Sequence, residues 1–226
     1  METILSLKNV SKFFGSSQHA RREVVKSISF NLKRKESIAI IGKSGSGKST
    51  ILNMIAGLEK PDEGIIDIEG QNINTLTSDS ISDIRLKKIG YVFQFFNLLP
   101  TLSLSENIKV PGFILGLSKA EIDKRALKYI DRVGLSKNTV SRLPHEISGG
   151  ESQRGAIARA LFCNPTILLA DEPTGNLDSE SAEKILEIFK EIPNEFNTSL
   201  IVVTHDDDTK NIANRVLTLE DGKIVE

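Results

Sequence analysis

The run GKSGSGKST, Gly42–Thr50, follows the apolar run Ile38–Ile41 and precedes the helical pattern of Ile51–Ala56. This order of strand, glycine-rich loop and helix is the setting in which a phosphate-binding loop works. The glycines let backbone N–H groups turn inward around phosphate oxygens, and the N-terminus of the helix adds positive potential. A glycine-rich turn without a ligand is the alternative, and the flanking strand and helix argue against it. The stretch therefore predicts a nucleotide-binding P-loop.

Two side chains of this loop have predicted roles beyond those of its backbone. Lys48 can reach the β- and γ-phosphates of a nucleotide, and the Ser49 hydroxyl can ligate Mg²⁺. The predicted nucleotide-binding set is the whole run: Gly42, Lys43, Ser44, Gly45, Ser46, Gly47, Lys48, Ser49 and Thr50.

A second apolar run, Ile167–Ala170, ends in the acidic pair Asp171 and Glu172. The carboxyl ends of parallel strands open at one edge of a sheet, so we expect this pair to lie beside the P-loop. Asp171 would hold Mg²⁺ through water, and Glu172 would polarise the attacking water as general base. An acidic strand end followed by a proline turn is the alternative, but together with the P-loop the catalytic interpretation is favoured.

Two more polar residues follow predicted buried strands, Gln94 after Tyr91–Phe93 and His205 after Ile201–Thr204. Gln94 can offer an oxygen to Mg²⁺ or to water. His205 can donate a hydrogen bond to the γ-phosphate and to the attacking water. Taken singly, a glutamine or histidine at a strand end is more often solvated or capping, so both assignments depend on the neighbouring motifs.

The composition is that of an ordinary globular protein, with 226 residues, 39% hydrophobic and 26% charged. Its 29 basic and 30 acidic residues give a net charge of −1, which provides no overall attraction for nucleic acid or an anionic membrane. Cys163 is the single cysteine, so no intrachain disulfide can form and a reducing compartment is favoured. The start lacks a secretory pattern, and the apolar runs are far shorter than the roughly 20 residues that span a bilayer. If the protein serves a membrane process, we expect another chain to cross the membrane.

Apolar patterning predicts a single α/β domain, 1–226, with a mainly parallel core sheet. Near-continuous apolar runs are typical of strands buried on both faces of such a sheet. They occur at Ser37–Ile41, Tyr91–Phe93, Thr166–Ala170 and Ser199–Val203. Alternating runs rich in β-branched residues predict an N-terminal antiparallel β subdomain. These runs are Leu5–Val10, Val24–Phe30 and Ile65–Ile68.

Helical spacing of apolar residues predicts two helices. One lies between Ser118 and Val133, with Ser118 and Glu121 as a capping box at its start. The other begins at Asp178, and its shared apolar face consists of Ala182, Ile185, Leu186 and Phe189. We therefore predict a helical subdomain at about 97–160, inserted into a nucleotide-binding core of about 1–96 and 161–226.

The run ISGGESQR, Ile147–Arg154, has no role in ordinary P-loop kinases or GTPases. With the P-loop, Gln94, the acidic pair, Gly175–Asp178 and His205, it resembles the nucleotide-binding subunit of an ABC transporter, in order and over essentially the whole chain. The resemblance implies ATP and Mg²⁺ as cofactors and a P-loop NTPase fold of the ABC ATPase type.

The resemblance also implies that two copies of the chain pack head to tail, with each ATP between the P-loop of one copy and the Ser-Gly-Gly signature of the other. Ser148, Gly149 and Gly150 would then contact the γ-phosphate bound by the partner copy. A helix starting near Glu151 would present its N-terminus to that anion. A glycine loop with a helix cap is the alternative for this run taken alone.

The family places an aromatic residue against the adenine ring, and Phe14 falls at that position, although Phe13 and Phe14 could instead be core residues. Ile147 stands where leucine is usual and Ser152 where a longer polar residue is common. We expect activity to survive both departures. Gly155, inside the predicted helix, should cost about 1 kcal/mol relative to alanine.

The runs Gln94–Pro100, Ser105–Ile108 and Ala170–Asp178 are similar to those of lipoprotein-releasing, macrolide-export, antimicrobial-peptide-resistance and cell-division ATPases. This resemblance implies a transport-coupled ATPase that drives a separate, permease-like membrane subunit for export, lipoprotein release or mechanical signalling. It implies a cytoplasmic chain, peripheral on the inner face of the cytoplasmic membrane through that partner, with no span of its own and no nucleic acid partner.

Two other functions stay open at this point. A soluble P-loop kinase of a small molecule would use the same loop, but it leaves the signature run and the position of Glu172 beside Asp171 unexplained. A non-transport ABC ATPase acting on DNA or ribosomes generally has long coiled-coil insertions or two fused cassettes, and this sequence has neither.

Overall fold

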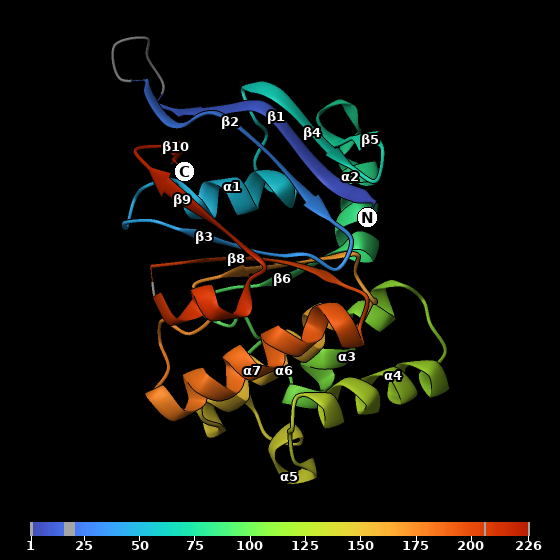
Figure 1. Cartoon of the computed structure of the whole chain (residues 1–226). Helices are drawn as coiled ribbons and strands as arrows, with labels where there is room; N and C mark the ends of the chain where they lie inside the picture. Colours follow the sequence, from blue (N-terminus) through green and yellow to red (C-terminus); the bar gives the residue numbers. More distant parts are fainter. Residues whose placement is uncertain (1, 16–20, 206, 226) are drawn as a thin grey trace.

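The computed structural model describes residues 2–15, 21–205 and 207–225. Figure 1 shows an antiparallel sheet on one side of helix α1 (Lys48–Ile55) and a second sheet on its other side. The first sheet has the strand order β2-β1-β4-β5 and only antiparallel pairs, as the sequence predicted. Its strands are β1 (Thr3–Phe14), β2 (Arg22–Lys33), β4 (Glu63–Ile68) and β5 (Gln71–Asn72).

The second sheet has the strand order β10-β9-β3-β8-β7-β6. Its strands are β3 (Ser37–Ile41), β6 (Ile89–Val92), β7 (Ile167–Asp171), β8 (Ser199–Thr204), β9 (Arg215–Glu220) and β10 (Lys223–Val225). Every pair from β9 to β6 is parallel, and only β10 runs antiparallel to its neighbour. The predicted α/β fold with a mainly parallel core sheet is therefore confirmed. The sequence did not predict β9, which lies between β10 and β3, or the edge strand β10, because neither has a continuous apolar run.

The central strands are buried on both faces, which explains their continuous apolar sequence. In β3, Ile38 and Ile40 belong to a core shared with α1 and the first sheet, whereas Ala39 belongs to a second core. In β7, Leu169 belongs to the first of these cores and Leu168 to the second. Successive side chains of a strand point to opposite faces, so one sheet supports both cores.

Helices cover the second core. They are α3 (Leu104–Ile114), α4 (Lys119–Arg132), α5 (Lys137–Val140), α6 (Gly149–Leu161) and α7 (Ser179–Glu195). Figure 1 shows them on the side of the second sheet that faces away from α1. The short turns are η1 (Ile73–Thr75), η2 (Pro144–Glu146) and η3 (Asp207–Ile212). Four of these helices, α3 to α6, begin within the stretch for which the sequence predicted a helical subdomain, and the division into subdomains stays a prediction.

The remaining helix, α2 (Ser78–Lys88), was not predicted, because it has no fully buried side chain and so no apolar stripe to recognise. Within the described ranges, no helix is both long and apolar enough to cross a membrane.

The two predicted helices form with small corrections. In α4, Ser118 Oγ accepts from Glu121 N as expected, but the Glu121 carboxylate accepts from Arg125 Nε at 2.7 Å instead of returning to the cap. The predicted capping box is therefore half formed. In α7, Ile185 and Phe189 are fully buried, and Asp178 caps the helix.

The expectation for Gly155 considered helix propensity alone, and the structure adds a packing constraint. This glycine lies in α6 against the fully buried Leu104 of α3, and a Cβ at Gly155 would overlap Leu104 Cδ1 and lie 2.9 Å from Leu104 Cγ. Glycine lowers the helix propensity of α6, but here it allows α3 and α6 to approach each other closely.

We predict that Gly155→Ala destabilises the protein, because overpacking of about 1–3 kcal/mol exceeds the roughly 1 kcal/mol gained in helix propensity. Urea unfolding of the purified chain measures the difference. In a Leu104→Ala background the space is open, so the same substitution should become neutral or stabilising. Stabilisation by Gly155→Ala in the wild-type background would contradict this packing argument.

Candidate functional site

The carboxyl ends of neighbouring parallel strands bring the predicted site residues together. The P-loop follows β3, the acidic pair lies at the end of β7, His205 follows β8, and Gln94 follows β6. A cavity of about 450 Å³ opens at this edge. It is lined by Val24, Ser44, Gly45, Gly47, Lys48, Ser49, Thr50, Gln94, Glu172 and His205. Most of the residues predicted from separate stretches of sequence therefore share one pocket.

Gly47 shapes the start of α1. It has φ 108°, and a Cβ there would lie 2.8 Å from Val24 O, so only glycine fits. No side chain caps α1, and no acidic residue lies in its first turn. The first N–H groups of α1 lack intrahelical partners, which is the arrangement that binds a phosphate.

Lys48 is 5% exposed, and three contacts hold its ammonium at the loop. It donates to Gly42 O at 2.7 Å and to Lys43 O at 3.1 Å, and it lies 3.8 Å from Glu172 Oε1. Ser46 differs from the other loop residues, because its hydroxyl is buried without a hydrogen-bond partner in the described structure. Any contact of Ser46 with a phosphate would therefore come from its backbone.

Both carboxylates of the acidic pair face the loop, Glu172 toward Lys48 and Asp171 toward Ser49. Asp171 Oδ1 accepts from Ser49 Oγ at 3.0 Å. Burial raises the pKa of Asp171, and the negative charge of Glu172 adds to this, while the Ser49 hydrogen bond opposes it. A cation beside these oxygens would offset the cost of burying the charge. Mg²⁺ prefers hard oxygen ligands and commonly takes one or two carboxylates together with phosphates, so Ser49 and Asp171 fit this ion.

Glu172 is held in an unusual conformation. Its φ is 47°, in the left-handed region that non-glycine residues rarely adopt, and its N–H donates to Val203 O at 2.9 Å. Its Oε2 lies 2.5 Å from His205 Nδ1. An atom added at Gly175 would lie 3.7 Å from both Glu172 Oε2 and Gln94 Nε2, which places these two side chains near one another. The arrangement can hold a water between a carboxylate, an amide and an imidazole.

The signature residues lie elsewhere. Ser148 is the N-cap of α6 and forms a complete capping box: its Oγ accepts from Glu151 N at 3.2 Å, and Glu151 Oε2 accepts from Ser148 N at 2.9 Å. Ser148 and Gly149 are exposed, whereas Gly150 is buried against Ser181. None of the three lines the P-loop pocket of the same chain.

Phe14 is 43% exposed, with Lys12 Nζ 5.4 Å from its ring centroid, so it is not a core residue. Phe13 is half-buried and carries the Arg21 guanidinium 4.2 Å from its ring centroid. Neither ring lines the P-loop pocket. Stacking of Phe14 on adenine stays a prediction.

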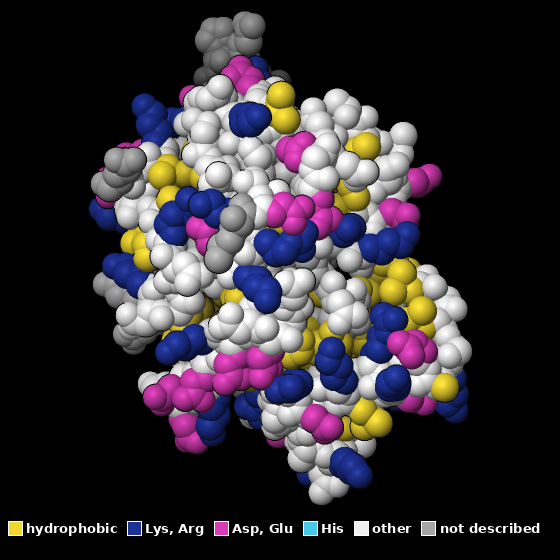
Figure 2. All heavy atoms as spheres, turned by 45° about the vertical axis from the view of Figure 1, so that its right-hand side comes forward, with side chains coloured by type: hydrophobic (Ala, Val, Ile, Leu, Met, Phe, Trp, Pro, Cys, Tyr) yellow, Lys and Arg dark blue, Asp and Glu magenta, His cyan; other side chains and the backbone are white. Residues whose placement is uncertain are grey.

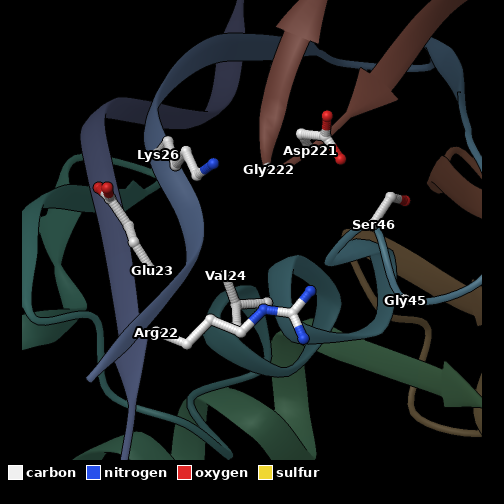
Figure 3. A pocket seen from close by; sticks show the side chains of 8 residues that line it. All are labelled: Arg22, Glu23, Val24, Lys26, Gly45, Ser46, Asp221 and Gly222. Atoms are coloured by element: carbon white, nitrogen blue, oxygen red, sulfur yellow. The ribbon is translucent and has the colours of Figure 1, made fainter. Parts of the chain in front are cut away.

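A second hollow, of about 420 Å³, flanks the P-loop and shares Val24 and Gly45 with the first. Figure 3 shows Arg22 of β2 extending toward the loop and Lys26 pointing toward Gly222, with Glu23 turned the other way. The sequence did not single out these two cations. Glu23 and Asp221 also line this hollow, so the two cations share it with two carboxylates.

Supporting residues were also missed. Gln153 of α6 is fully buried and donates from Nε2 to Pro173 O at 2.7 Å. Asn176 Nδ2 donates to Gln94 O at 3.2 Å. Tyr91 donates to Asn53 Oδ1 at 3.0 Å, and burial together with the charge of Asp171 raises its pKa. Their polarity within apolar or glycine-rich runs was the available signal, but their partners are distant in sequence.

Residues 25–175 match the family described as ABC transporter. The lipoprotein-releasing system ATP-binding protein LolD of Bacteroides fragilis is 40% identical over 98% of this chain and 100% of its own length. The macrolide export ATP-binding/permease protein MacB of Mannheimia succiniciproducens is 42% identical over 99% of this chain, which spans 34% of that longer protein. A dimeric post-hydrolysis structure of the ATP-binding cassette MJ0796, from Methanocaldococcus jannaschii, bound to ADP and Pi, is 40% identical with a TM-score of 0.91, covering 99% of this chain and 97% of that one.

Proposed function

Because the chain belongs to the ABC transporter family, we propose that two copies of it close around shared ATP sites and thereby drive a separate membrane protein. The chain is an ATP-binding, ATP-hydrolysing subunit of that family, as the sequence predicted. The family match argues against the small-molecule kinase. The relatives named for lipoprotein release and macrolide export belong to the group that the sequence resembles.

One observation carries the shared-site proposal: the P-loop pocket of this chain is not lined by its own signature residues. Ser148 and Gly149 instead lie exposed at the start of α6, where helix N–H groups can bind an anion. A head-to-tail pair places this helix start over the γ-phosphate of the other copy. The similar cassette that was solved as a dimer supports the pairing of two copies.

Within each site we propose a separate role for each residue. Ser49, Gln94 and Asp171 hold Mg²⁺, and Lys48 neutralises the β- and γ-phosphates. Glu172 accepts a proton from the attacking water, and His205, 2.5 Å from Glu172 Oε2, orients that water and the γ-phosphate. Phe14, exposed at the end of β1, stacks on the adenine ring.

We predict that Glu172→Gln binds ATP but hydrolyses it roughly 10²–10⁴-fold more slowly, because the amide keeps the size of the side chain without its basicity. Phosphate release measures turnover, and light scattering measures accumulation of an ATP-bound dimer. Glu180→Gln, an exposed substitution on α7, is the matched control and should behave as wild type. Near wild-type turnover in Glu172→Gln would assign the base elsewhere.

Mixing two inactive chains tests the shared sites. Lys48→Ala should lose ATP binding, because its P-loop lacks the buried cation, and Ser148→Arg should bind ATP but pair poorly, because the added bulk intrudes on the γ-phosphate of the partner. In the mixed dimer both defects meet in one site and the other site is intact. The mixture should therefore recover ATPase activity that neither chain shows alone. If hydrolysis requires two intact sites, the mixture should still recover ATP-dependent pairing.

The control for this experiment is Ser118→Arg, which removes a comparable N-cap from α4, since Ser118 Oγ accepts from Glu121 N. The loss of either cap costs about 1 kcal/mol. Ser118→Arg should keep its ATPase activity. Full activity of Ser148→Arg as a monomer would show that the sites are not shared.

For the membrane partner we propose a docking face beside α3. Phe95, Phe113 and Ile114 are large apolar side chains that are 71%, 62% and 65% exposed. A hollow of about 330 Å³, lined by residues that include Tyr91, Phe93, Pro111 and Cys163, lies in the same region. Figure 2 shows hydrophobic side chains gathered in and beside a notch between the upper and lower parts of the molecule. Such a partner would keep this chain peripheral on the inner face of the cytoplasmic membrane.

We predict that the wild-type chain copurifies with an integral membrane protein from detergent-solubilised membranes, and that Phe113→Glu abolishes this, because a carboxylate cannot be buried unpaired in an apolar contact. Val216→Glu is the matched control, since Val216 is exposed in β9, which β3, β8 and β7 separate from β6. Equal loss of the membrane protein in both variants would argue against this face.

A further inference from the structure

The segment that carries Gln94 ends in a tight turn. Phe96 N donates to Phe93 O at 3.3 Å, and Asn97 N donates to Phe95 O at 2.6 Å. Phe96 and Asn97 have φ values of 59° and 48°, so two consecutive non-glycine residues adopt the left-handed conformation. Such a conformation persists only where surrounding contacts hold it.

Arg159, in the last turn of α6, supplies these contacts. Its Nη1 donates to Asn97 O at 2.6 Å and its Nη2 donates to Phe96 O at 2.9 Å. The planar guanidinium can donate both bonds in a fixed fork geometry, which a lysine cannot reproduce. One side chain therefore holds both strained carbonyls.

Arg159 is only partly exposed, and this partial burial of its charge has a cost that its contacts must offset. Desolvation lowers the pKa of its guanidinium, which nevertheless stays charged. No carboxylate lies within salt-bridge distance of Arg159 in the part of the chain that the structure describes. A partly buried cation without an ion-pair partner is compensated by the two carbonyls that accept its hydrogen bonds. The two carbonyls therefore stabilise the Arg159 charge, and the Arg159 guanidinium stabilises the left-handed turn at Phe96 and Asn97.

Two further hydrogen bonds link the Gln94 segment and α6 to the loop after β7. Asn176 Nδ2 donates to Gln94 O at 3.2 Å, which ties the first residue of the segment to the loop after β7. Gln153 Nε2 donates to Pro173 O at 2.7 Å, which ties α6 to that same loop. Arg159 forms the third link, between α6 and the Gln94 segment. The three segments are thus joined pairwise by side-chain donors to backbone carbonyls.

We propose that Arg159 is a positioning residue that holds Gln94 at the ATP site and joins it to the helix that presents Ser148 to the partner copy. This inference rests on the proposed roles of Gln94 and Ser148. Helix α6 has Ser148 at its start and Arg159 in its last turn, so displacement of the Gln94 segment at one ATP is transmitted along a rigid helix to the other ATP. The two sites of the dimer are mechanically linked through this contact.

Arg159→Lys tests the proposal while keeping the charge. We expect kcat for ATP hydrolysis to fall roughly 10- to 100-fold, because a small displacement of a positioning contact has effects of this size. KM for ATP should change little, since the P-loop is untouched. The Mg²⁺ concentration for half-maximal activity should rise, as in Gln94→Ala, because Gln94 is a proposed Mg²⁺ ligand. Arg132→Lys, at an exposed ion pair with Glu195, is the matched control and should leave all three quantities unchanged.

A double-mutant cycle separates positioning from general destabilisation. If Arg159 acts through Gln94, then Arg159→Lys combined with Gln94→Ala should be no slower than Gln94→Ala alone. Additive losses, or a kcat of Arg159→Lys within about twofold of wild type, would overturn the proposal. Thermal unfolding confirms that each variant is folded. Arg159→Gln, which keeps an amide donor without the charge, replaces the lysine variant if that chain does not fold.

The same cycle distinguishes this inference from the proposed function. Full activity of Gln94→Ala would remove the proposed role of Gln94, and the inference with it. A strong loss in Gln94→Ala with an unaffected Arg159→Lys would leave the proposed function intact and reject only the role of Arg159.

Discussion

The hydrogen-bond register of strands β3, β8 and β7 is the constraint on which the site depends. Ile41 pairs with Thr204, and Asp171 pairs with Val203, so the P-loop, His205 and the acidic pair leave the sheet at nearly the same level. Glu172 continues the ladder by donating to Val203 O at 2.9 Å. A slip of one residue would turn every core side chain of a strand to the wrong face. The two cores therefore maintain the geometry of the site.

Polar and strained groups are concentrated where that framework ends. Lys48 is almost fully buried, burial raises the pKa of Asp171, and Glu172 adopts a left-handed backbone conformation. Each of these features costs free energy in the isolated chain. In the proposed function, phosphates would pair with Lys48 and Mg²⁺ with Asp171, so that nucleotide binding would stabilise the closed pair of copies.

Helix α6 connects the parts of the molecule that face different partners. Ser148 lies at its exposed start, Gln153 anchors its middle to the loop after β7, and Arg159 holds the Gln94 segment. Arg159 also lines the hollow in the region of the exposed Phe95 and Phe113. Gly155 lets α3 approach this helix closely, so the proposed docking face and the signature rest on one packed pair of helices.

The amino-acid sequence by itself determined the fold class, the P-loop, the acidic pair and the family. These features are local: glycines at fixed spacing, apolar runs of strand length, and polar residues placed directly after them. Burial of a strand on both faces leaves a continuous apolar run, which can be recognised without knowing the neighbours of that strand. Strands β9 and β10 and helix α2 lack such a pattern, because most of their side chains are not buried, and the sequence did not predict them.

Only the tertiary structure decided which residues meet. Arg159 and Phe96 are 63 positions apart, and the clash that makes Gly155 necessary comes from Leu104 on another helix. Residue periodicity reports whether a segment is buried, but not which atoms of a distant segment cover it. The pairing of buried donors with carbonyls and the space beside a glycine depend on the packing of whole elements, so these contacts became apparent only in the folded chain.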